Sequence, residues 1–250
     1  MSKPSSNSVG TATIQSLSPD PIIVVSPHCD DGIFSCGTLL CQCPGSNVIT
    51  VFAGAPTTST ALCPWDVAAG FHVGDDVMAL RRQEDERAIR LLRGRPIWLP
   101  FLDSQYRSPN TLSPPAVAEA LEHALETLPS RVVILPLGLF HHDHELVHEA
   151  GLLLLRRDRQ RHWMFYADAI YRGIAGLLEE RLRRLRASSL SLLPMAVPLD
   201  PVASARKRQA VDCYGSQLRA LTSPGRPGLL DILEPEQYWD VEVSDHGVNG

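Results

Sequence analysis

Five apolar runs in the sequence lack the polar alternation that a strand with one solvent-facing side would show. They lie at residues 22–25, 47–53, 96–101, 131–137 and 163–167. Between and after them lie stretches with helical spacing of apolar residues, at about 33–43, 76–93, 115–128, 143–157 and 171–187. Strands that are apolar on both faces and alternate with helices are typical of a mostly parallel sheet covered on both sides. The sequence therefore predicts a Rossmann-like α/β fold with right-handed crossovers.

The remaining segments determine the predicted domain organisation. Residues 1–20 are rich in Ser, Thr and Pro, which predicts a flexible leader. Residues 21–250 are long enough for one such domain. Two prolines in the run at 96–101 predict an edge strand or a strand end. A Pro-rich segment at 194–201 precedes a last predicted helix at about 203–222, so we expect helical and strand additions after the parallel sheet.

Charge and composition exclude several classes of partner. A net charge of −5 and a pI near 6.0 do not favour binding to nucleic acid or to an anionic membrane surface. No apolar run approaches the length of a membrane span, and the N-terminal residues show no apolar core of a signal peptide. We therefore expect a cytoplasmic protein whose six cysteines are reduced thiols.

Polar residues follow two of the predicted strands directly. The run at 22–25 leads through Ser26 and Pro27 into His28-Cys29-Asp30-Asp31, and the run at 131–137 leads into GLFHHDHELVHEA at 138–150. Ligands of open α/β sheets bind beyond the carboxyl ends of the strands. We therefore expect these two loops to meet there.

A divalent metal would explain why two adjacent carboxylates stand beside an imidazole. Its charge offsets the repulsion between Asp30 and Asp31, and it accepts imidazole nitrogen and carboxylate oxygen as ligands. His28, Asp31 and one histidine of the second loop would form the three-ligand set of a catalytic zinc, leaving Asp30 to take a proton from water. The alternative is that these residues cap the following helix. Because a second histidine-bearing loop is expected beside the first, the sequence favours the metal.

The second loop also contains an HExxH match, His144-Glu145-Leu146-Val147-His148, which is the signature of zincin metalloproteases. In that interpretation His144 and His148 share one helix face and Glu145 acts as the base. Alternatively, one of the two histidines is an ordinary helix-surface residue. The protease interpretation leaves the polar residues at 28–31 without a role, so it is the weaker one.

Together the two loops resemble the LmbE/PIG-L family of zinc-dependent N-deacetylases. The first motif of that family is [AS]-H/P-H-P-D-D-E and the second is H-P-D-H; the corresponding segments here are SPHCDDG at 26–32 and HHDH at 141–144. The resemblance covers roughly residues 21–240, because further segments match at 81–94, 99–107, 207–217 and 234–239.

The resemblance implies a role for each matching site residue. His28, Asp31 and His144 would hold one zinc ion per chain. Asp30 aligns with the general base of the family, and His141 aligns with a histidine that polarises or protonates the reacting amide.

Further residues are implied to contact the substrate or to support the site. Asp143 would orient a histidine. Arg81, Glu84 and Asp103 fall where relatives contact the sugar or line its pocket, although the first two would also suit a solvated helix face. Cys29 replaces a motif proline; its thiol would suit zinc, but it is expected to point into the packing between strand and helix.

Two other departures from the family motifs leave the implied ligands and base in place. His142 replaces the second proline, and Gly32 replaces the glutamate that usually follows the two aspartates.

These observations lead to one predicted activity and its alternatives. We expect a zinc-dependent amidohydrolase that removes an N-acetyl or other N-acyl group from an amino sugar or glycoconjugate, in secondary metabolism. One alternative is an amidase acting on a thiol conjugate or another small natural product. Another is a zinc- or sugar-binding protein without catalysis. The expected partner is a small N-acyl amino sugar or glycoconjugate, and the sequence is compatible with either a monomer or a homo-oligomer.

Overall fold

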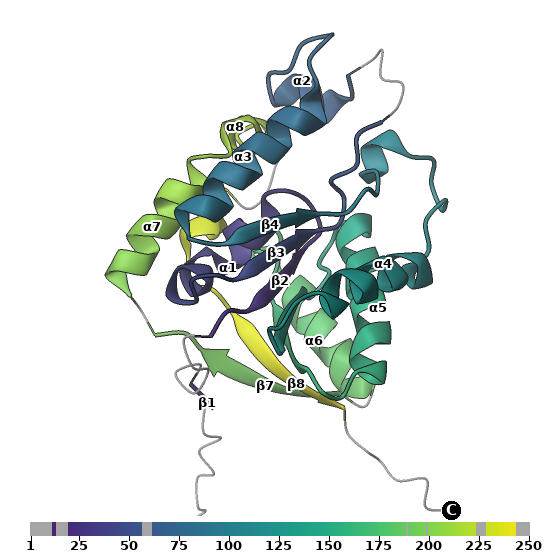
Figure 1. Ribbon diagram of the computed structural model, residues 1–250, viewed down its shortest axis with the longest axis vertical. Helices are drawn as coiled ribbons and strands as arrows, with labels where there is room; N and C mark the ends of the chain where they lie inside the picture. The colour runs from purple at the N-terminus through teal and green to yellow at the C-terminus, as the bar shows by residue number, and fades with distance from the viewer. Residues whose placement is uncertain are drawn as a thin grey trace, which may run out of the picture.

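A single sheet runs through the described part of the computed structural model, which comprises residues 12–13, 20–56, 62–188, 190–198, 200–223 and 229–243. The eight strands follow the order β1-β7-β8-β6-β5-β2-β3-β4, and helices cover both faces of the sheet (Figure 1). The Rossmann-like α/β fold with C-terminal additions is thereby confirmed.

All five predicted parallel strands are present. They are β2 (Ile23–Ser26), β3 (Asn47–Thr50), β4 (Arg95–Trp98), β5 (Val132–Pro136) and β6 (His162–Tyr166). Every residue of β2 and β3 is buried, as expected for strands that are covered on both faces. Strand β4 lies at the edge of the sheet, where the missing N–H of Pro96 removes no needed ladder bond.

Helices from two parts of the chain form the two outer layers. One face of the sheet is covered by α1 (Asp31–Gln42), α3 (Val77–Leu91), α7 (Pro201–Val211) and α8 (Gly215–Leu221). The other face is covered by α4 (Pro114–Glu126), α5 (His142–Arg157) and α6 (Leu177–Ala187). The short helix α2 (Pro64–Ala68) lies at the top of the view in Figure 1.

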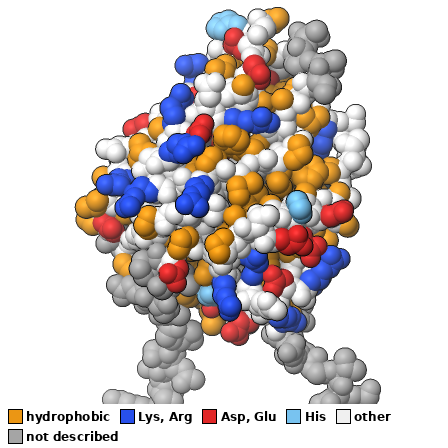
Figure 2. All heavy atoms as spheres, in the orientation of Figure 1, with side chains coloured by type: hydrophobic (Ala, Val, Ile, Leu, Met, Phe, Trp, Pro, Cys, Tyr) orange, Lys and Arg blue, Asp and Glu red, His pale blue; other side chains and the backbone are white. Residues whose placement is uncertain are grey.

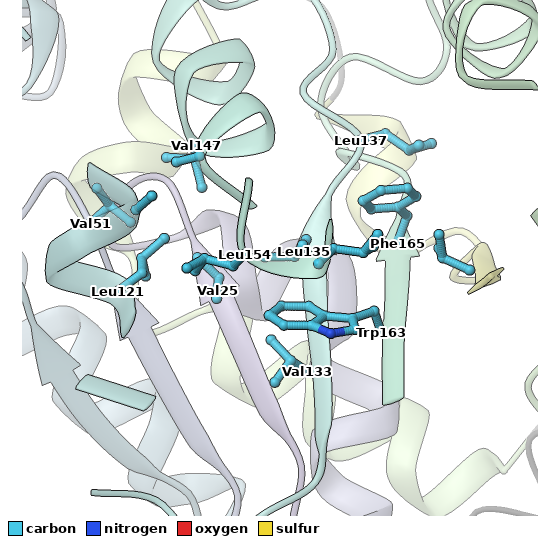
Figure 3. Packing of buried hydrophobic residues seen from close by; sticks show 14 of the residues in the cluster. Val25, Val51, Leu121, Val133, Leu135, Leu137, Val147, Leu154, Trp163 and Phe165 are labelled. Atoms are coloured by element: carbon cyan, nitrogen blue, oxygen red, sulfur yellow. The ribbon is translucent and has the colours of Figure 1, made fainter. Parts of the chain in front are cut away.

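Each face of the sheet has its own hydrophobic core. Between the sheet and α4–α5, side chains of Val25, Leu135 and Phe165 from the strands meet Leu121 and Val147 from the helices (Figure 3). All five are fully buried. Because burial of one such side chain contributes about 1.5–3 kcal/mol, this layer holds β2, β5 and α5 firmly in place.

The C-terminal segments differ from the prediction in two ways. Residues 190–196 form strand β7 (Leu190–Ala196) where a linker was expected to begin, and β7 pairs antiparallel with β8 (Tyr238–Val243). Pro194 and irregular burial along β7 concealed this strand in the sequence, because its pairing depends on a segment more than 40 residues later. Strand β1 (Ala12–Thr13) pairs in parallel with β7, so the predicted leader contributes one short strand. Apart from Asp20, the rest of residues 1–20 lies outside the described residues.

Two of the predicted helices have different bounds. The helix expected at 171–187 begins only at Leu177, since Gly176 before it has a φ of +77° that a helix cannot continue. The helix expected at 203–222 is divided into α7 and α8. The break places Tyr214 in the core, where its hydroxyl donates to Oδ1 of Asp85 at 2.8 Å.

Charged side chains of both signs lie near one another on the surface (Figure 2), as expected for a chain with a modest net charge. Figure 2 shows Lys and Arg side chains near Asp and Glu side chains on one face, with hydrophobic side chains between them. Among the described residues, no helix combines the length and apolar character needed to cross a membrane.

Asp85 is a buried carboxyl group between α3 and the sheet. It is fully buried and accepts hydrogen bonds from Trp98 Nε1 at 2.7 Å, from the Tyr214 hydroxyl at 2.8 Å and from Thr50 Oγ1 at 3.4 Å. Burial raises the pKa of Asp85 to about 7, although the hydrogen bonds from Trp98 and Tyr214 act in the opposite direction.

We expect Asp85→Asn to flatten the pH dependence of stability. The native carboxyl keeps its proton up to about pH 7, whereas the unfolded chain releases it near its ordinary pKa of 3.8. The free energy of unfolding therefore falls between these pH values, by up to about 4 kcal/mol. Urea unfolding from pH 4 to pH 8 measures the free energy of unfolding of both proteins. That of the wild type should fall relative to that of the variant as the pH rises. Parallel curves would contradict this assignment.

Candidate active site

The turn after β2 places the first group of polar side chains. The Ser26 hydroxyl donates to the carbonyl oxygen of His28 at 2.5 Å and accepts from the Gly32 N–H at 2.8 Å. A Cβ at Gly32 would lie 3.1 Å from Val48 Cγ1 and 3.2 Å from the Ser26 side chain, so a larger residue there would have to displace these neighbours slightly. Asp30 occupies the N-cap position of α1, yet its side chain makes no capping hydrogen bond. The capping interpretation therefore does not account for this carboxylate.

The second group of polar side chains comes from the loop between β5 and α5. Strands β2 and β5 are parallel neighbours at the point where the strand order reverses. Their carboxyl ends consequently lie side by side, which is where ligands bind in open α/β sheets. His141 is the N-cap of α5, and His144 lies in its first turn. The predicted meeting of the two loops is confirmed.

His28, Asp31 and His144 converge on one point. Each offers one ligand atom, and these atoms lie within 4.8 Å of one another. Oδ2 of Asp31 is 3.1 Å from Nδ1 of His28 and 3.1 Å from Nε2 of His144. His144 Nε2 is buried and makes no well-directed hydrogen bond, although Asp31 Oδ2 is close to it; a metal ion between the two atoms would satisfy both. Two imidazoles and one carboxylate fit the donor set of a three-ligand divalent metal site.

The electrostatics of the same three residues favour a cation. Burial lowers the pKa of His144, but Asp31 and Asp168 outweigh it and raise that pKa to about 9. His28 likewise has a pKa well above its ordinary value, because Asp103, Asp143 and Asp31 outweigh burial. The pKa of Asp31 lies well below its usual range, since His144 and His28 outweigh burial. Acidic groups that favour positive charge on two imidazoles would equally attract a divalent metal in place of the protons.

Asp168, which the sequence analysis missed, orients one of these histidines. Its Oδ1 lies 2.6 Å from Nδ1 of His144, and its Oδ2 accepts from the Leu139 N–H at 3.1 Å. A carboxylate on the far nitrogen of a ligating histidine sets the tautomer and orientation of the ring. No motif marks Asp168; the available signal was its position just after β6, the next strand beyond β5.

Asp143 is placed beside the other proposed histidine ligand. Its Oδ2 is 3.1 Å from His28 Nε2 and accepts from the Ser104 N–H at 2.9 Å, while Oδ1 accepts from Arg107 Nη2. His28, His141 and Asp143 form a second group whose ligand atoms lie within 4.8 Å of one another. Arg107 was missed by the sequence analysis, and it anchors this carboxylate.

Asp30 and His141 line the same cavity, and their pKa values are shifted in opposite directions. Burial and the neighbouring Asp31 raise the pKa of Asp30 to about 7. Burial, together with His28 and His144, lowers the pKa of His141 to about 4. The N–H of Asp143 donates to His141 Nδ1 at 3.2 Å, so a neutral His141 ring carries its proton on Nε2.

These side chains lie in a cavity of about 260 Å³ beyond the carboxyl edge of the sheet. Two of the three predicted substrate contacts, Arg81 and Asp103, are among its lining residues. Arg81 is 5% exposed and its Nη2 donates to Asp66 at 2.7 Å. Glu84 is not among the lining residues; its carboxylate instead accepts from the Ser216 N–H at 2.9 Å and from the Ser216 hydroxyl at 2.5 Å.

Several apolar and aromatic side chains of the cavity were not anticipated. Trp65 from α2 donates its indole N–H to Gln217 of α8 at 3.0 Å. The Tyr171 ring lies 5.1 Å from the His144 ring and 6.5 Å from the His141 ring. Further lining residues of this kind are Phe52, Met78, Phe140, Ile170 and Leu221. Apart from Phe140, which adjoins His141, they come from segments without a recognised motif, so only the fold brings them together.

The second histidine of the HExxH match lies apart from the converging ligands. His148 is 1% exposed, its Nδ1 lies 2.9 Å from the Pro136 carbonyl oxygen, and its ring packs 5.0 Å from that of Phe165. Glu145 pairs with Arg181 at 3.2 Å. Among the described residues, His148 belongs to neither metal-ligand group, and neither does Cys29, which packs with Ala53 and Met78.

Comparison with solved structures finds the same fold in deacetylases. The A40926 pseudoaglycone deacetylase is 26% identical with a TM-score of 0.74, covering 90% of this chain and 98% of that one. A deacetylase from the biosynthesis pathway of teicoplanin is 25% identical with a TM-score of 0.74, covering 91% and 100%. The 4-carboxy-2-hydroxymuconate hydratase of Pseudomonas putida, 13% identical with a TM-score of 0.52 over 92% and 99%, shares the fold.

The amino-acid sequence adds family membership to this structural likeness. No curated protein matches the chain significantly. The PIG-L family, described as GlcNAc-PI de-N-acetylase, matches residues 23–155, just over half of the chain, from β2 to α5. Both histidine-bearing loops lie within this range. The chain therefore belongs to the PIG-L family and is a metal-dependent N-deacetylase.

Proposed function

We propose that the protein is a zinc-dependent hydrolase that removes the N-acetyl group from an amino sugar within a larger secondary metabolite. The observation that carries this proposal is the cavity in which Asp30, free of capping bonds, stands beside the converging ligand atoms of His28, Asp31 and His144. A binding protein would have no need for an additional buried acid at this point. The two similar deacetylases that act on A40926 pseudoaglycone and in teicoplanin biosynthesis support the choice of substrate class.

The metal would be held by His28, Asp31 and His144. Zinc accepts nitrogen and oxygen donors of this kind, and it supplies a Lewis acid for the amide carbonyl and lowers the pKa of water to about 7. Asp168 would keep the His144 ring in the orientation that directs Nε2 toward the metal position.

Asp30 would act as the base of the reaction. It takes a proton from the attacking water while the water oxygen forms a bond to the amide carbon. The same proton is then delivered to the amide nitrogen, and the carbon–nitrogen bond breaks. The products are acetate and a free amino sugar. Burial and Asp31 raise the pKa of Asp30 and a bound metal would lower it, so the carboxyl group would both take a proton from water and return it to nitrogen.

His141 would stabilise the negative oxygen that develops on the amide carbonyl. Its Nδ1 accepts the Asp143 N–H, so the Nε2–H of the neutral ring is the group available to donate. The lowered pKa keeps the ring neutral at neutral pH, so Nδ1 can accept the Asp143 N–H while Nε2–H donates to the substrate oxygen. Donors of this type are typically worth 10²–10³-fold in kcat.

Acetate release tests the proposed function. Metal-free protein should release acetate from N-acetylated amino sugars after addition of one equivalent of zinc, and little without metal. Excess zinc belongs in a separate series, because a teicoplanin deacetylase has been crystallised in a zinc-inhibited form. An N-acetylated thiol conjugate and an unmodified peptide serve as competing substrates. Cleavage of the peptide alone, or activity that does not depend on metal, would contradict the proposal.

A further inference from the structure

Phe140 is exposed although it is a large apolar residue that lines the active-site cavity. Its exposed fraction is 61%, and it immediately precedes His141. Leaving such a side chain in water forgoes the free energy of burying it. Among the exposed large apolar side chains of the described residues, Phe140 lines this cavity, where a bound ligand would cover its ring.

The backbone at Phe140 is strained in a way that keeps the side chain exposed. Its φ is +63°, in the left-handed region that non-glycine residues seldom adopt. The His141 N–H donates to the Leu139 carbonyl oxygen at 2.7 Å, which closes a three-residue γ-turn of the rare, strained type. Such strain persists where the neighbouring structure enforces it, most often at functional sites.

Both neighbours of Phe140 are held by the active site. Leu139 is fully buried, and its N–H donates to Asp168 Oδ2 at 3.1 Å. His141 caps α5 and accepts the Asp143 N–H. The turn between these two anchored residues directs Phe140 outward, so the exposed ring is a consequence of the geometry that places the catalytic loop.

The Phe140 ring is also supported on one side. Its centroid lies 5.2 Å from that of Tyr171, with an angle of 34° between the ring planes. Tyr171 in turn lies against His141 and His144. A ring that is already held in place loses little conformational entropy when a ligand packs against it.

The size of the cavity indicates what the ring contacts. At about 260 Å³ the cavity lies just below the roughly 300–1,000 Å³ of typical ligand sites. One N-acetylated sugar whose amide reaches the ligand residues would occupy most of it, and any group attached to that sugar would extend outward. Aromatic rings favour offset or edge-on contacts with other rings.

We propose that Phe140 is a specificity-determining residue that binds an aromatic aglycone carried by the amino sugar. This inference rests on the proposed function, because it assumes that an amino sugar occupies the cavity. It names the substrate class more closely: a sugar linked to an apolar aromatic group, in preference to a free amino sugar.

The test compares N-acetylglucosamine with its 4-nitrophenyl β-glycoside. Phe140→Gly and Phe140→Asn both accept the positive φ and remove the ring. Each variant is expected to lower the ratio of kcat/KM for the aryl glycoside to that for the free sugar by about tenfold, mainly through KM of the glycoside. Val202→Ala on α7, another exposed apolar position at 66% exposure, is the control and should leave the ratio unchanged.

Binding of the aryl glycoside to metal-free protein, measured by calorimetry, provides a second readout without turnover. A Kd about tenfold weaker in Phe140→Gly supports the inference. An unchanged ratio with an unchanged Kd would overturn it, and so would a parallel loss on both substrates. N-octanoylglucosamine, which carries a longer acyl chain, is assayed as a third substrate. A fall in kcat/KM confined to this substrate would assign the ring to the acyl chain and also overturn the inference. Wild-type protein that binds the glycoside through Phe140 but releases no acetate would refute the proposed function alone.

Discussion

Asp30→Asn is expected to lower kcat by ~10²–10⁴-fold while the protein still binds the proposed metal. The carboxylate lines the cavity, makes no capping bond and is not among the three converging ligand residues. Asparagine is nearly the same size but cannot take a proton from water. Acetate release under saturating substrate gives kcat, and elemental analysis of the same preparation gives the metal content.

The pH profile adds a second signature to this prediction. Without metal, burial and Asp31 raise the pKa of Asp30 to about 7, and a bound cation lowers that pKa. Because the base must be ionised, kcat of the wild type should rise with pH through a midpoint below about 7, and Asp30→Asn should lose this rise. Asp212→Asn, an exposed position at the end of α7, is the control. Loss of zinc from Asp30→Asn would make Asp30 a ligand; full activity would place the base elsewhere, with His141 next to be tested.

Asp31→Ala is expected to abolish stoichiometric zinc binding, whereas His148→Ala should keep it. Asp31 Oδ2 lies 3.1 Å from both histidine ligand atoms, so its removal takes away one of three ligands and leaves two imidazoles without their negative partner. His148 lies in the core against Phe165 and the Pro136 carbonyl. Elemental analysis after dialysis against zinc, with circular dichroism as a check on folding, measures both variants.

The two variants separate the deacetylase site from an HExxH metalloprotease site. Removal of a buried side chain such as His148 costs on the order of 2–4 kcal/mol, so His148→Ala is compared with His148→Gln, which retains a donor. Loss of zinc in both His148 variants, with retention in Asp31→Ala, would reverse the assignment. Loss of zinc in His28→Ala and in His144→Ala is the matching positive control.

The amino-acid sequence was sufficient to predict the five parallel strands, because burial on both faces leaves an uninterrupted apolar run in each of them. The same pattern located the two loops at neighbouring strand ends, and the residue types within them predicted a metal. Strand β7 could not be predicted this way. Its hydrogen-bonding partner is β8, far along the chain, and its proline and irregular burial resemble a linker.

For the site, the sequence determined the chemistry and the tertiary structure decided the surroundings. His28, Asp30, Asp31, His141 and His144 are recognisable because their spacing within two short loops is local. Their positions still required the pairing of β2 with β5.

The supporting groups had no local signal. The carboxylate of Asp168 orients His144 from the end of another strand, and Arg107 anchors Asp143 from a separate loop. Glu84, expected in the cavity, bonds instead to Ser216. The exposed ring of Phe140 depends on a strained turn between two anchored neighbours. Such features arise when distant segments pack together, and a pattern of neighbouring residues along the chain does not encode them.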